Sequence, residues 1–273
     1  MTTLKKAIKY IVIAFAIFLI ITIIGVTLSS VWLFGGQFRR DAVLDDIKTY
    51  SVTSEINNLN IRINAADLYI KEGNIFSIES NLKYINLEEK GDTLIVEETK
   101  KFRGNYNGSV LTIYIPSGTI LYNTNITTGA GRLTIENLSS GTLDLELGAG
   151  EVYINSLIAT QSADIEGGAG RITIVDSILK NLDFEMGVGQ LNLTTALIGE
   201  CQLNLGVGET NLILIGNKND YKLELEKGLG RVFVDGKDAF DYASSGNGIN
   251  LVEINGGIGS INVQFKESEE KWY

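Results

Sequence analysis

The sequence predicts an all-β protein, a parallel β-solenoid of about 19–20-residue two-strand coils, preceded by one transmembrane α-helix. Three observations lead to this prediction. A Gly-x-Gly triplet recurs at a nearly constant spacing, short runs of alternating apolar and polar residues flank it, and one long uncharged stretch lies near the N-terminus. Alternation with a period of two is typical of half-buried strands, and a fixed repeat of this length is typical of solenoids.

The uncharged stretch runs from Ile11 to Leu28 and stays apolar through Phe34. About 20 helical residues, rising about 1.5 Å each, cross a hydrocarbon core roughly 30 Å thick. We therefore expect residues 10–34 to form a transmembrane helix. An uncleaved anchor is preferred to a cleaved signal peptide, because the stretch exceeds the roughly 7–15 residues of a secretory core region.

Charges beside the span predict its orientation. Three lysines precede it, and cationic flanks stay in the cytoplasm. Residues 1–9 are therefore expected to be cytoplasmic and the C-terminal domain extracytoplasmic, at a bacterial cell membrane. Residues 35–50 are expected to be a polar connector.

Residues 51–128 contain alternating runs, for example at 59–63 and 110–115, but no glycine repeat. Such runs predict strands, and without the repeat they are expected to form an irregular β segment that caps the solenoid. The charged tail, residues 266–273, is expected to protect the other end of the stack against edge pairing.

The glycine repeat occupies residues 129–265. Each unit reads as strand, turn, strand and Gly-x-Gly corner. One unit cannot bury its apolar row alone, so neighbouring units should stack about 4.8 Å apart. The aliphatic residue between the two glycines is expected to fill the core at the corner. The triplets begin at Gly129, Gly148, Gly168, Gly187, Gly206, Gly228 and Gly257, with gaps of 19, 20, 19, 19, 22 and 29.

A Gly-x-Gly motif also occurs in nucleotide-binding loops and in calcium-binding β-rolls. A nucleotide loop needs a helix after the glycines, whereas a strand-like run follows here. The calcium repeat needs an aspartate two residues after the last glycine, but Leu133, Val152 and Ile172 occupy that position. We expect neither kind of site.

Composition excludes several chemistries. The chain contains no histidine, which removes Ser-His-Asp and Cys-His nucleophiles and every imidazole metal site. The single cysteine, Cys201, shares the apolar phase of Leu203 and Leu205, so we interpret it as a small buried hydrophobe. A net charge of -10 argues against nucleic acid as a partner. We predict no catalytic residue, no cofactor and no metal ligand.

Two outward-facing columns follow from aligning the coils. The residues directly after the triplets alternate in sign or are neutral, which predicts a ladder of cross-strand pairs. They are Arg132, Glu151, Arg171, Gln190, Glu209 and Arg231.

The second column is acidic on three successive coils, and like charges facing each other destabilise a sheet. Two interpretations remain open: a solvated face that keeps the protein soluble, or a face that binds cations or a basic partner. Paired carboxylates also suggest a glycosidase, but acid–base catalysis needs a cleft and two different environments. The six residues are Asp144, Glu146, Asp164, Glu166, Asp183 and Glu185.

The order of these features resembles a known family. An N-terminal span, irregular strands, the step Tyr114-Ile-Pro-Ser-Gly118 and repeated Gly-x-Gly coils are similar to the bacterial DUF4097 putative-adhesin family, related to the outer parts of envelope-stress proteins. The resemblance covers about residues 51–265. It implies a β-solenoid on the outer side of a bacterial membrane, and it carries no catalytic residue across.

We therefore expect a non-catalytic, membrane-anchored structural or interaction module, adhesin-like in character. One alternative is a regulatory or sensory component of cell-envelope stress signalling, and a further one is a carbohydrate-active β-helix enzyme. The expected partners are the membrane, through the single N-terminal span, and another envelope protein or a surface polymer.

Overall fold

The computed structural model describes residues 44–99, 106, 108–226, 228–239 and 242–267. The predicted cytoplasmic end (1–9), the transmembrane helix (10–34) and most of the connector lie outside these residues. Across the described ranges, no helix is both long enough and apolar enough to cross a bilayer.

The described part of the chain forms one sheet, and a three-residue 3-10 helix, η1 (Lys218–Asp220), interrupts it. The first strand begins at Leu44, so the β domain starts inside the stretch expected to be a connector. The strands are β1 (Leu44–Ser51), β2 (Asn58–Ala65), β3 (Asp67–Gly73), β4 (Ser77–Leu82), β5 (Ile85–Lys90), β6 (Thr93–Glu98), β7 (Val110–Pro116), β8 (Ile120–Ile135), β9 (Leu138–Ile154), β10 (Leu157–Lys180), β11 (Leu182–Ile198), β12 (Glu200–Ile215), β13 (Tyr221–Glu226), β14 (Leu229–Val234), β15 (Lys237–Asp238), β16 (Tyr242–Ser245) and β17 (Asn250–Lys266).

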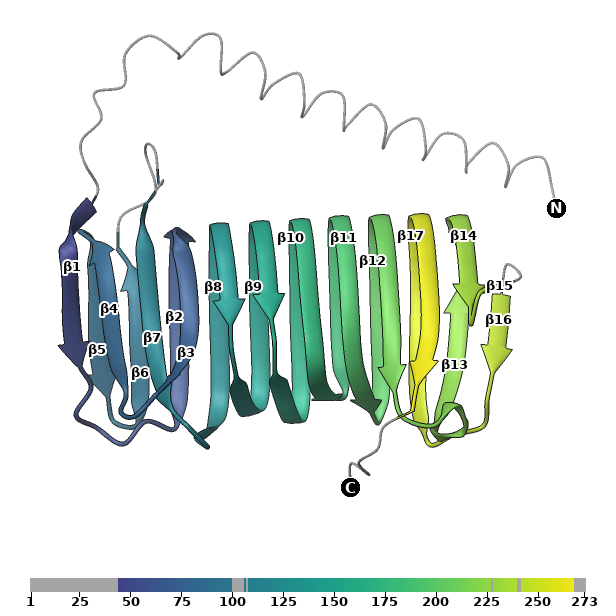
Figure 1. Ribbon diagram of the computed structural model, residues 1–273, viewed down its shortest axis with the longest axis horizontal. Coiled ribbons are helices and arrows are strands. Elements are labelled where there is room, and N and C mark those ends of the chain that lie inside the picture. The colour runs from purple at the N-terminus through teal and green to yellow at the C-terminus, as the bar shows by residue number, and fades with distance from the viewer. Residues whose placement is uncertain (1–43, 100–105, 107, 227, 240–241, 268–273) are drawn as a thin grey trace, which may run out of the picture. The chain divides into compact units, whose positions relative to one another are not determined.

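Strands β8 to β12 are consecutive coils that pair in parallel and stand side by side (Figure 1). Asp144 is registered against Asp164, and Asp164 against Asp183, so one coil advances the chain by 20 or 19 residues. This confirms the repeat that the glycine spacing predicts. Each coil is one continuous strand bent at the Gly-x-Gly triplet, so the two predicted strands are its two halves.

The link between coils is paired as well. Leu157 is registered against Leu138, and Ala159 against Ser140, before the register shifts. The link is paired in the same way between β8 and β9 and between β10 and β11. These coils therefore carry a third short ladder, which the prediction of two strands per coil omitted.

Alternation places one side of every coil in the core. Leu143, Leu145 and Leu147 are buried, and Leu145 lies between Ile126 and Ile165 of the neighbouring coils. Repeating this arrangement coil after coil builds one continuous apolar interior.

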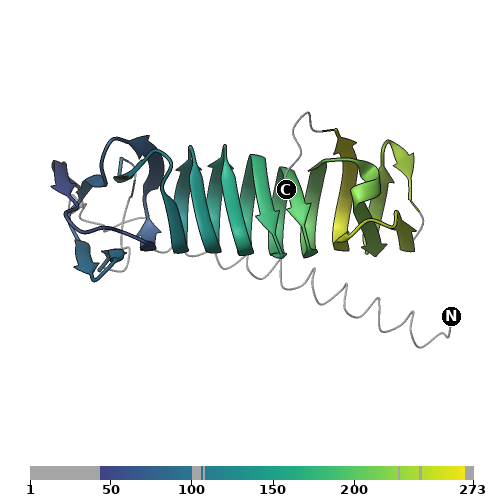
Figure 2. The ribbon, with the colours of Figure 1, turned by 90° about the horizontal axis from the view of Figure 1, so that it is seen from below.

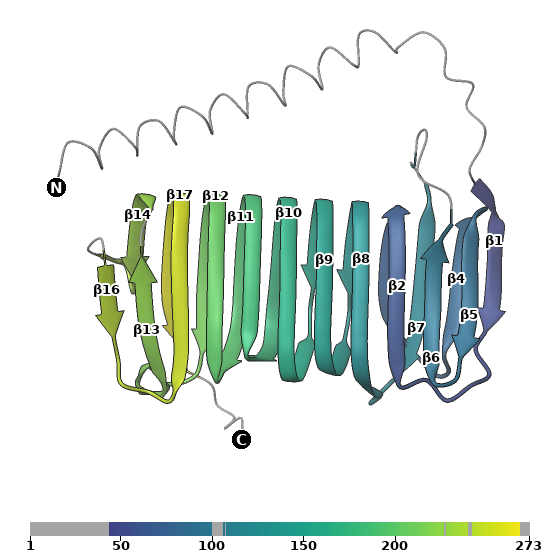
Figure 3. The same cartoon turned by 180° about the vertical axis from the view of Figure 1, so that it is seen from behind.

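The order of the coils departs from the order of the chain at both ends. The C-terminal strand β17 pairs with β12 on one side and with β13 and β14 on the other (Figures 1 and 3). At the N-terminal end, β2 and β3 lie between β8 and the strands β6 and β7. In the structure Gly257 lies between Gly206 and Gly228.

Antiparallel strands cover both ends of the stack (Figure 2). At the C-terminal end β16 pairs with β13 and β15 with β14; at the other end β5 pairs with β6 and β4 with β7. The long gap between the triplets at Gly228 and Gly257 therefore supplies the cap strands β15 and β16. Such caps matter because an open parallel edge is a template for pairing with another chain.

Glu98 completes the N-terminal cap. Its carboxylate accepts hydrogen bonds from the backbone N–H groups of Asn64 (2.8 Å) and Ala65 (3.2 Å). Ala65 is the counterpart of Ala130 at the corner of the next coil. The Glu98 side chain thus satisfies donors that a further coil would otherwise pair.

Candidate functional site

The six predicted carboxylates lie in two adjacent columns on three successive coils. Asp164 is registered against both Asp144 and Asp183, and Glu166 against both Glu146 and Glu185. All six are exposed except Asp144, which is half-buried. Neighbouring rungs are about one strand spacing apart, roughly 4.8 Å between backbones.

Neutral polar side chains border the acidic block on both sides. Asn125 donates from Nδ2 to Asp144 Oδ2 at 3.1 Å, and the Thr127 hydroxyl donates to Glu146 Oε2 at 3.3 Å. On the coil beyond Asp183 and Glu185, the corresponding residues are Gln202 and Asn204. The uninterrupted run of carboxylates therefore lies on β9, β10 and β11, and the column becomes acidic again at Glu253 of β17, which is registered against Gln202 and Glu224.

Crowding of these carboxylates favours their protonated forms. Partial burial, followed by the charges of Asp164 and Glu146, raises the pKa of Asp144. Partial burial and the charge of Asp183 likewise raise the pKa of Asp164. Desolvation and the surrounding carboxylates, Asp164 first among them, raise the pKa of Glu166. The block is thus electrostatically strained at neutral pH.

A chelating site is not formed by this block. Within the described residues, no group of three or more acidic or cysteine side chains is placed so that it could hold a metal ion. The carboxylates stand in rows along the stack, where each points outward from its own coil.

A shallow trough of about 600 Å³ runs beside the glutamate column. Its floor is formed by the first glycine of four successive triplets, with Thr127, Asn204 and Asn255 toward its ends. The glutamates form one wall. We call this feature the corner trough; its floor glycines are Gly148, Gly168, Gly187 and Gly206, and its acidic wall is Glu146, Glu166 and Glu185.

Glycine is required on this floor because the coils approach closely there. A Cβ added to Gly148 would overlap the backbone carbonyl oxygen of Gly129 on the preceding coil. At the second glycine of the same triplet, Gly150, the φ angle is also positive, at 148°. Both demands select glycine, and the missing side chains leave the trough open.

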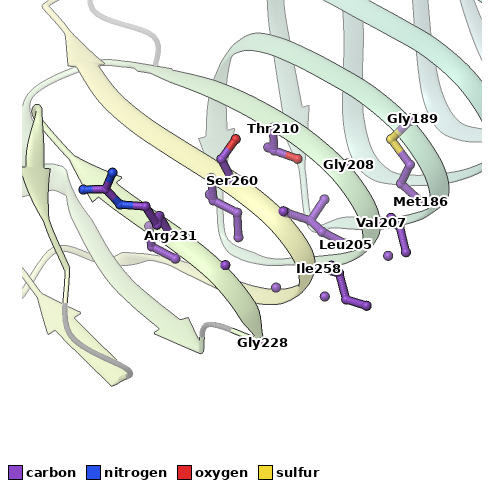
Figure 4. Close-up of a pocket in the computed structure, with 17 residues that line it drawn as sticks. Met186, Gly189, Leu205, Val207, Gly208, Thr210, Gly228, Arg231, Ile258 and Ser260 are labelled. Carbon is purple, nitrogen blue, oxygen red and sulfur yellow. The ribbon is translucent and has the colours of Figure 1, made fainter. Parts of the chain in front are cut away.

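The residue between the glycines points outward, which corrects our expectation that it fills the core. Val188, Val207 and Ile258 are 51%, 36% and 42% exposed. Figure 4 shows this corner, with Val207 and Ile258 on neighbouring coils. A gap of about 20 Å³ remains inside it, which is too small for an organic ligand.

The corner residues form an exposed apolar column, which we call the corner ridge. Its members are registered against one another from coil to coil and grow from alanine to isoleucine along the stack. The ridge consists of Ala149, Ala169, Val188, Val207 and Ile258.

Sequence reasoning missed the ridge although a signal for it exists. Leu147 and Val152 are both buried, yet their positions in the chain differ by an odd number, five. Strict alternation cannot bury both, so the phase must change between them, at the corner. Extending the alternation of the first half of the coil points Ala149 inward, whereas extending that of the second half points it outward, as observed.

The predicted charge ladder is present in part. Arg171 lies 3.4 Å from Glu151, which is also 3.7 Å from Arg132. Arg231 does not continue the ladder after Glu209, because Ser260 of β17 lies between them. Arg231 instead pairs with Asp238 at 3.1 Å.

Cys201 is buried, as predicted. Burial raises the pKa of its thiol, and the backbone N–H of Leu182 donates to its sulfur at 3.4 Å. The uncharged thiol is a structural part of the core.

The stacked parallel coils with glycine corners define a β-solenoid-type repeat protein with a grooved outer face. A family model described as Toastrack DUF4097 matches residues 56–253, and the chain belongs to this family. This confirms the family that the strands and Gly-x-Gly coils resemble, over residues that do not include the N-terminal span. No curated protein matches the chain.

Several solved structures are similar over most of their length. A putative cell adhesion protein from Clostridium sporogenes is 16% identical, with a TM-score of 0.36, covering 81% of this chain and 99% of that one. A putative adhesin from Bacteroides fragilis is 14% identical, with a TM-score of 0.41 and coverages of 80% and 95%. A putative lipid binding protein from Parabacteroides distasonis is 15% identical, with a TM-score of 0.39 and coverages of 81% and 96%. These values are too low to transfer a ligand.

Proposed function

We propose that this chain is a non-catalytic interaction module, adhesin-like in character, held at the outer face of a bacterial membrane by residues 10–34. The observation that carries the proposal is the corner trough, an open groove with a volume of about 600 Å³ whose lining repeats along the stack. A surface repeated from coil to coil suits an elongated partner, which gains contacts in proportion to the number of coils it crosses.

The same surface argues against the carbohydrate-active alternative. General acid–base catalysis needs two carboxylates whose pKa values are driven apart by different environments. The pKa values of Asp144, Asp164 and Glu166 are all raised, in each case by desolvation first and by neighbouring carboxylates next. Their setting is an open face instead of a cleft.

The test combines binding and turnover. Full-length protein in nanodiscs is presented to an array of glycans, envelope polymers and purified envelope proteins, while released reducing ends are assayed on the same samples. We expect retention of a polymer or an envelope protein without release of sugar. Release of reducing ends would refute the non-catalytic proposal. Capture of a membrane protein alone would favour the regulatory alternative.

The anchor needs its own test. Protease added to intact spheroplasts should digest the β domain and leave the lysine-flanked N-terminal end protected. Complete protection of the β domain would reverse the proposed orientation, and release of the domain from washed membranes would refute the uncleaved anchor.

A further inference from the structure

The corner ridge is an exposed apolar strip on a protein that is otherwise acidic at its surface. Val188, Val207 and Ile258 lie on adjacent coils and expose 51%, 36% and 42% of their surface. None of the three lines the corner trough. Aliphatic side chains exposed in a continuous row mark an interaction surface. The size of the side chains along the ridge and the charges beside it indicate what that surface contacts.

Side-chain size changes in one direction along the ridge. Ala149 and Ala169 belong to β9 and β10, valines to β11 and β12, and Ile258 and the half-buried Leu229 to β17 and β14. Two ridges facing each other in the same direction would place alanine opposite alanine and leave a gap at one end. In opposite directions, with a twofold axis between β11 and β12, valine faces valine and each larger residue faces an alanine. Facing positions that alternate large and small side chains interdigitate.

The charged column beside the ridge is complementary around the same axis. Its residues follow the ridge residues by two positions, on the same coils. With the two stacks antiparallel, each glutamate of one column faces an arginine or a glutamine of the other, and no two like charges face each other. The facing pairs, each formed twice, are Glu151–Arg231, Arg171–Ser260 and Gln190–Glu209.

Shifting the twofold axis by half a coil removes this complementarity. With the axis on β12, Glu209 faces the Glu209 of the second copy, and Arg171 faces Arg231. With the axis on β11, Arg171 faces Glu209 but Arg132 faces Arg231, so attraction and repulsion offset each other. Like charges in direct opposition disfavour an interface, so the column selects the axis between β11 and β12.

Residues on the trough side of the ridge are compatible with this arrangement. The glutamates of the trough precede the ridge residues by three positions. Around the same axis, two of them face asparagines, and only the pair at the end of the strip joins two carboxylates. These pairs are Glu185–Asn204, Glu166–Asn255 and Glu146–Glu226.

We propose that the corner ridge is a contact between two copies of this chain, with their stacks antiparallel around a twofold axis between β11 and β12. The contact is isologous, because both copies use the same strip. From β9 to β14 the strip is about 24 Å long, and a narrow strip of this length is typical of weak, transient association. The inference goes beyond the proposed function, because it concerns a surface outside the corner trough.

Crosslinking of cysteine variants tests the direction and the register. Full-length chains in detergent micelles carry Ala169→Cys or Ile258→Cys, and the parent chain with its buried Cys201 is the unreactive control. A bis-maleimide with a reach of about 8 Å should couple the mixed pair, which face each other, but not two copies of A169C, which lie three coil steps or about 14 Å apart. We expect the mixed sample to yield at least about fivefold more covalent dimer than either variant alone.

A pair of substitutions at the centre of the strip tests the contact itself. V188E/V207E, added to both cysteine variants, should lower the dimer yield at least about fivefold, because four carboxylates would meet around the axis. The matched control I75E/I120E adds the same charges at exposed isoleucines outside the ridge, and should change the yield less than about twofold. Circular dichroism melts of each variant verify that the coils remain folded.

A charge reversal tests the ends of the strip. Within one chain, Glu151 and Arg231 lie five coil steps or about 24 Å apart, too far to pair. E151R should lower the dimer yield at least about twofold, because it places two arginines opposite each other across the interface. E151R/R231E should restore the yield, because the reversed charges face each other again.

Four outcomes would overturn the inference. Coupling of A169C to itself as efficiently as to I258C would show a parallel or irregular contact. Absence of dimer in the mixed sample, equal loss in I75E/I120E, or failure of R231E to restore the yield of E151R would each refute the ridge contact. None of these measurements involves polymer binding or sugar release, so failure of the proposed function is observed separately.

Discussion

Glu209 of β12 is registered against Ser260 of β17, a residue that lies 51 positions further along the chain. The other side of Ser260 is registered against Arg231 of β14. The last strand of the described chain is therefore an inner member of the stack, and the segment made before it is the outer member. At this end of the stack, the order of the strands in space therefore differs from their order along the chain.

Deleting β17 tests whether this strand is an inner member of the stack. A chain that stops after Ile249 leaves β12 without its C-terminal neighbour and leaves β13 and β14 paired only with the short strands β16 and β15. We expect hydrogen exchange to show lost protection in β12, β13 and β14 while β8 and β9 stay protected. A chain that stops after Glu267 is the control. Unchanged protection of β13 in the shorter chain would contradict the pairing.

Leu145→Asp tests the core. Leu145 is 0% exposed, so the substitution buries an unpaired carboxylate and should cost about 4 kcal/mol or more of unfolding free energy. Glu146→Gln, one residue away on the exposed face, should change it by less than ~0.5 kcal/mol. Denaturant titration followed by circular dichroism measures both. Similar costs for the two substitutions would mean that the inside–outside alternation is misassigned.

Substitutions at two glycines distinguish steric crowding between coils from backbone strain. Gly148 has no positive φ, but a Cβ there would meet the Gly129 carbonyl oxygen, so Gly148→Ala should cost about 3 kcal/mol or more. Gly118 has φ 78° and open space around it, so Gly118→Ala should cost only about 1–2 kcal/mol. Thermal melts of both variants provide the comparison. A larger cost at Gly118 would show that coil-to-coil contact is looser than the structure indicates.

The acidic block should make stability depend on pH in an uncommon direction. The folded-state pKa values of Asp144, Asp164 and Glu166 are raised above their ordinary values. A raised carboxyl pKa disfavours the folded state above that pKa, and the penalty disappears as the pH falls through it toward the unfolded value near 4.

The variant D164N/E166Q isolates this contribution. It should be more stable than the parent chain at pH 7, and the difference should shrink as the pH is lowered toward about 4. Melting temperatures of both proteins across this range measure the difference, so that the titration of other carboxylates cancels. A gap that widens on acidification would contradict the upward direction of the shifts.

Divalent ions should relieve the same repulsion without being chelated. Within a Debye length of about 8 Å at physiological salt, neighbouring rungs still interact. Ca²⁺ or Mg²⁺ should therefore raise the melting temperature more than Na⁺ at equal ionic strength, and D164N/E166Q should lose most of the extra effect. A melting temperature indifferent to divalent ions would leave only the solvated-face interpretation.

The sequence predicts the repeating unit well because the unit is locally encoded. The alternation around Leu145, the glycines of the corner and the acidic positions each depend on neighbours within one coil, and the structure confirms their register. The Toastrack family match supports the same reading. Buried Cys201 followed from its phase with Leu203.

The order of the coils could not be predicted in this way. All coils present similar edges, so alternation does not specify which edge β17 joins, and the longer gaps of 22 and 29 residues are the only irregularity. The direction of Val188 was also mispredicted, because the corner changes the alternation phase. The first error concerns a relation between distant segments, which a local pattern does not contain, and the second concerns a change of phase within one coil.

At both ends of the stack the order of the strands in space departs from their order along the chain, and this restricts how such a protein can change length in evolution. Duplication of a unit of 19 or 20 residues can lengthen the stack and keep the existing strand pairs only if the copy falls between β8 and β12. In that part of the stack the order along the chain and the order in space agree. A copy placed after β13 or before β8 would separate an outer coil from the inner coil that pairs with it. Related proteins of different length should therefore vary in their number of middle coils and share both ends.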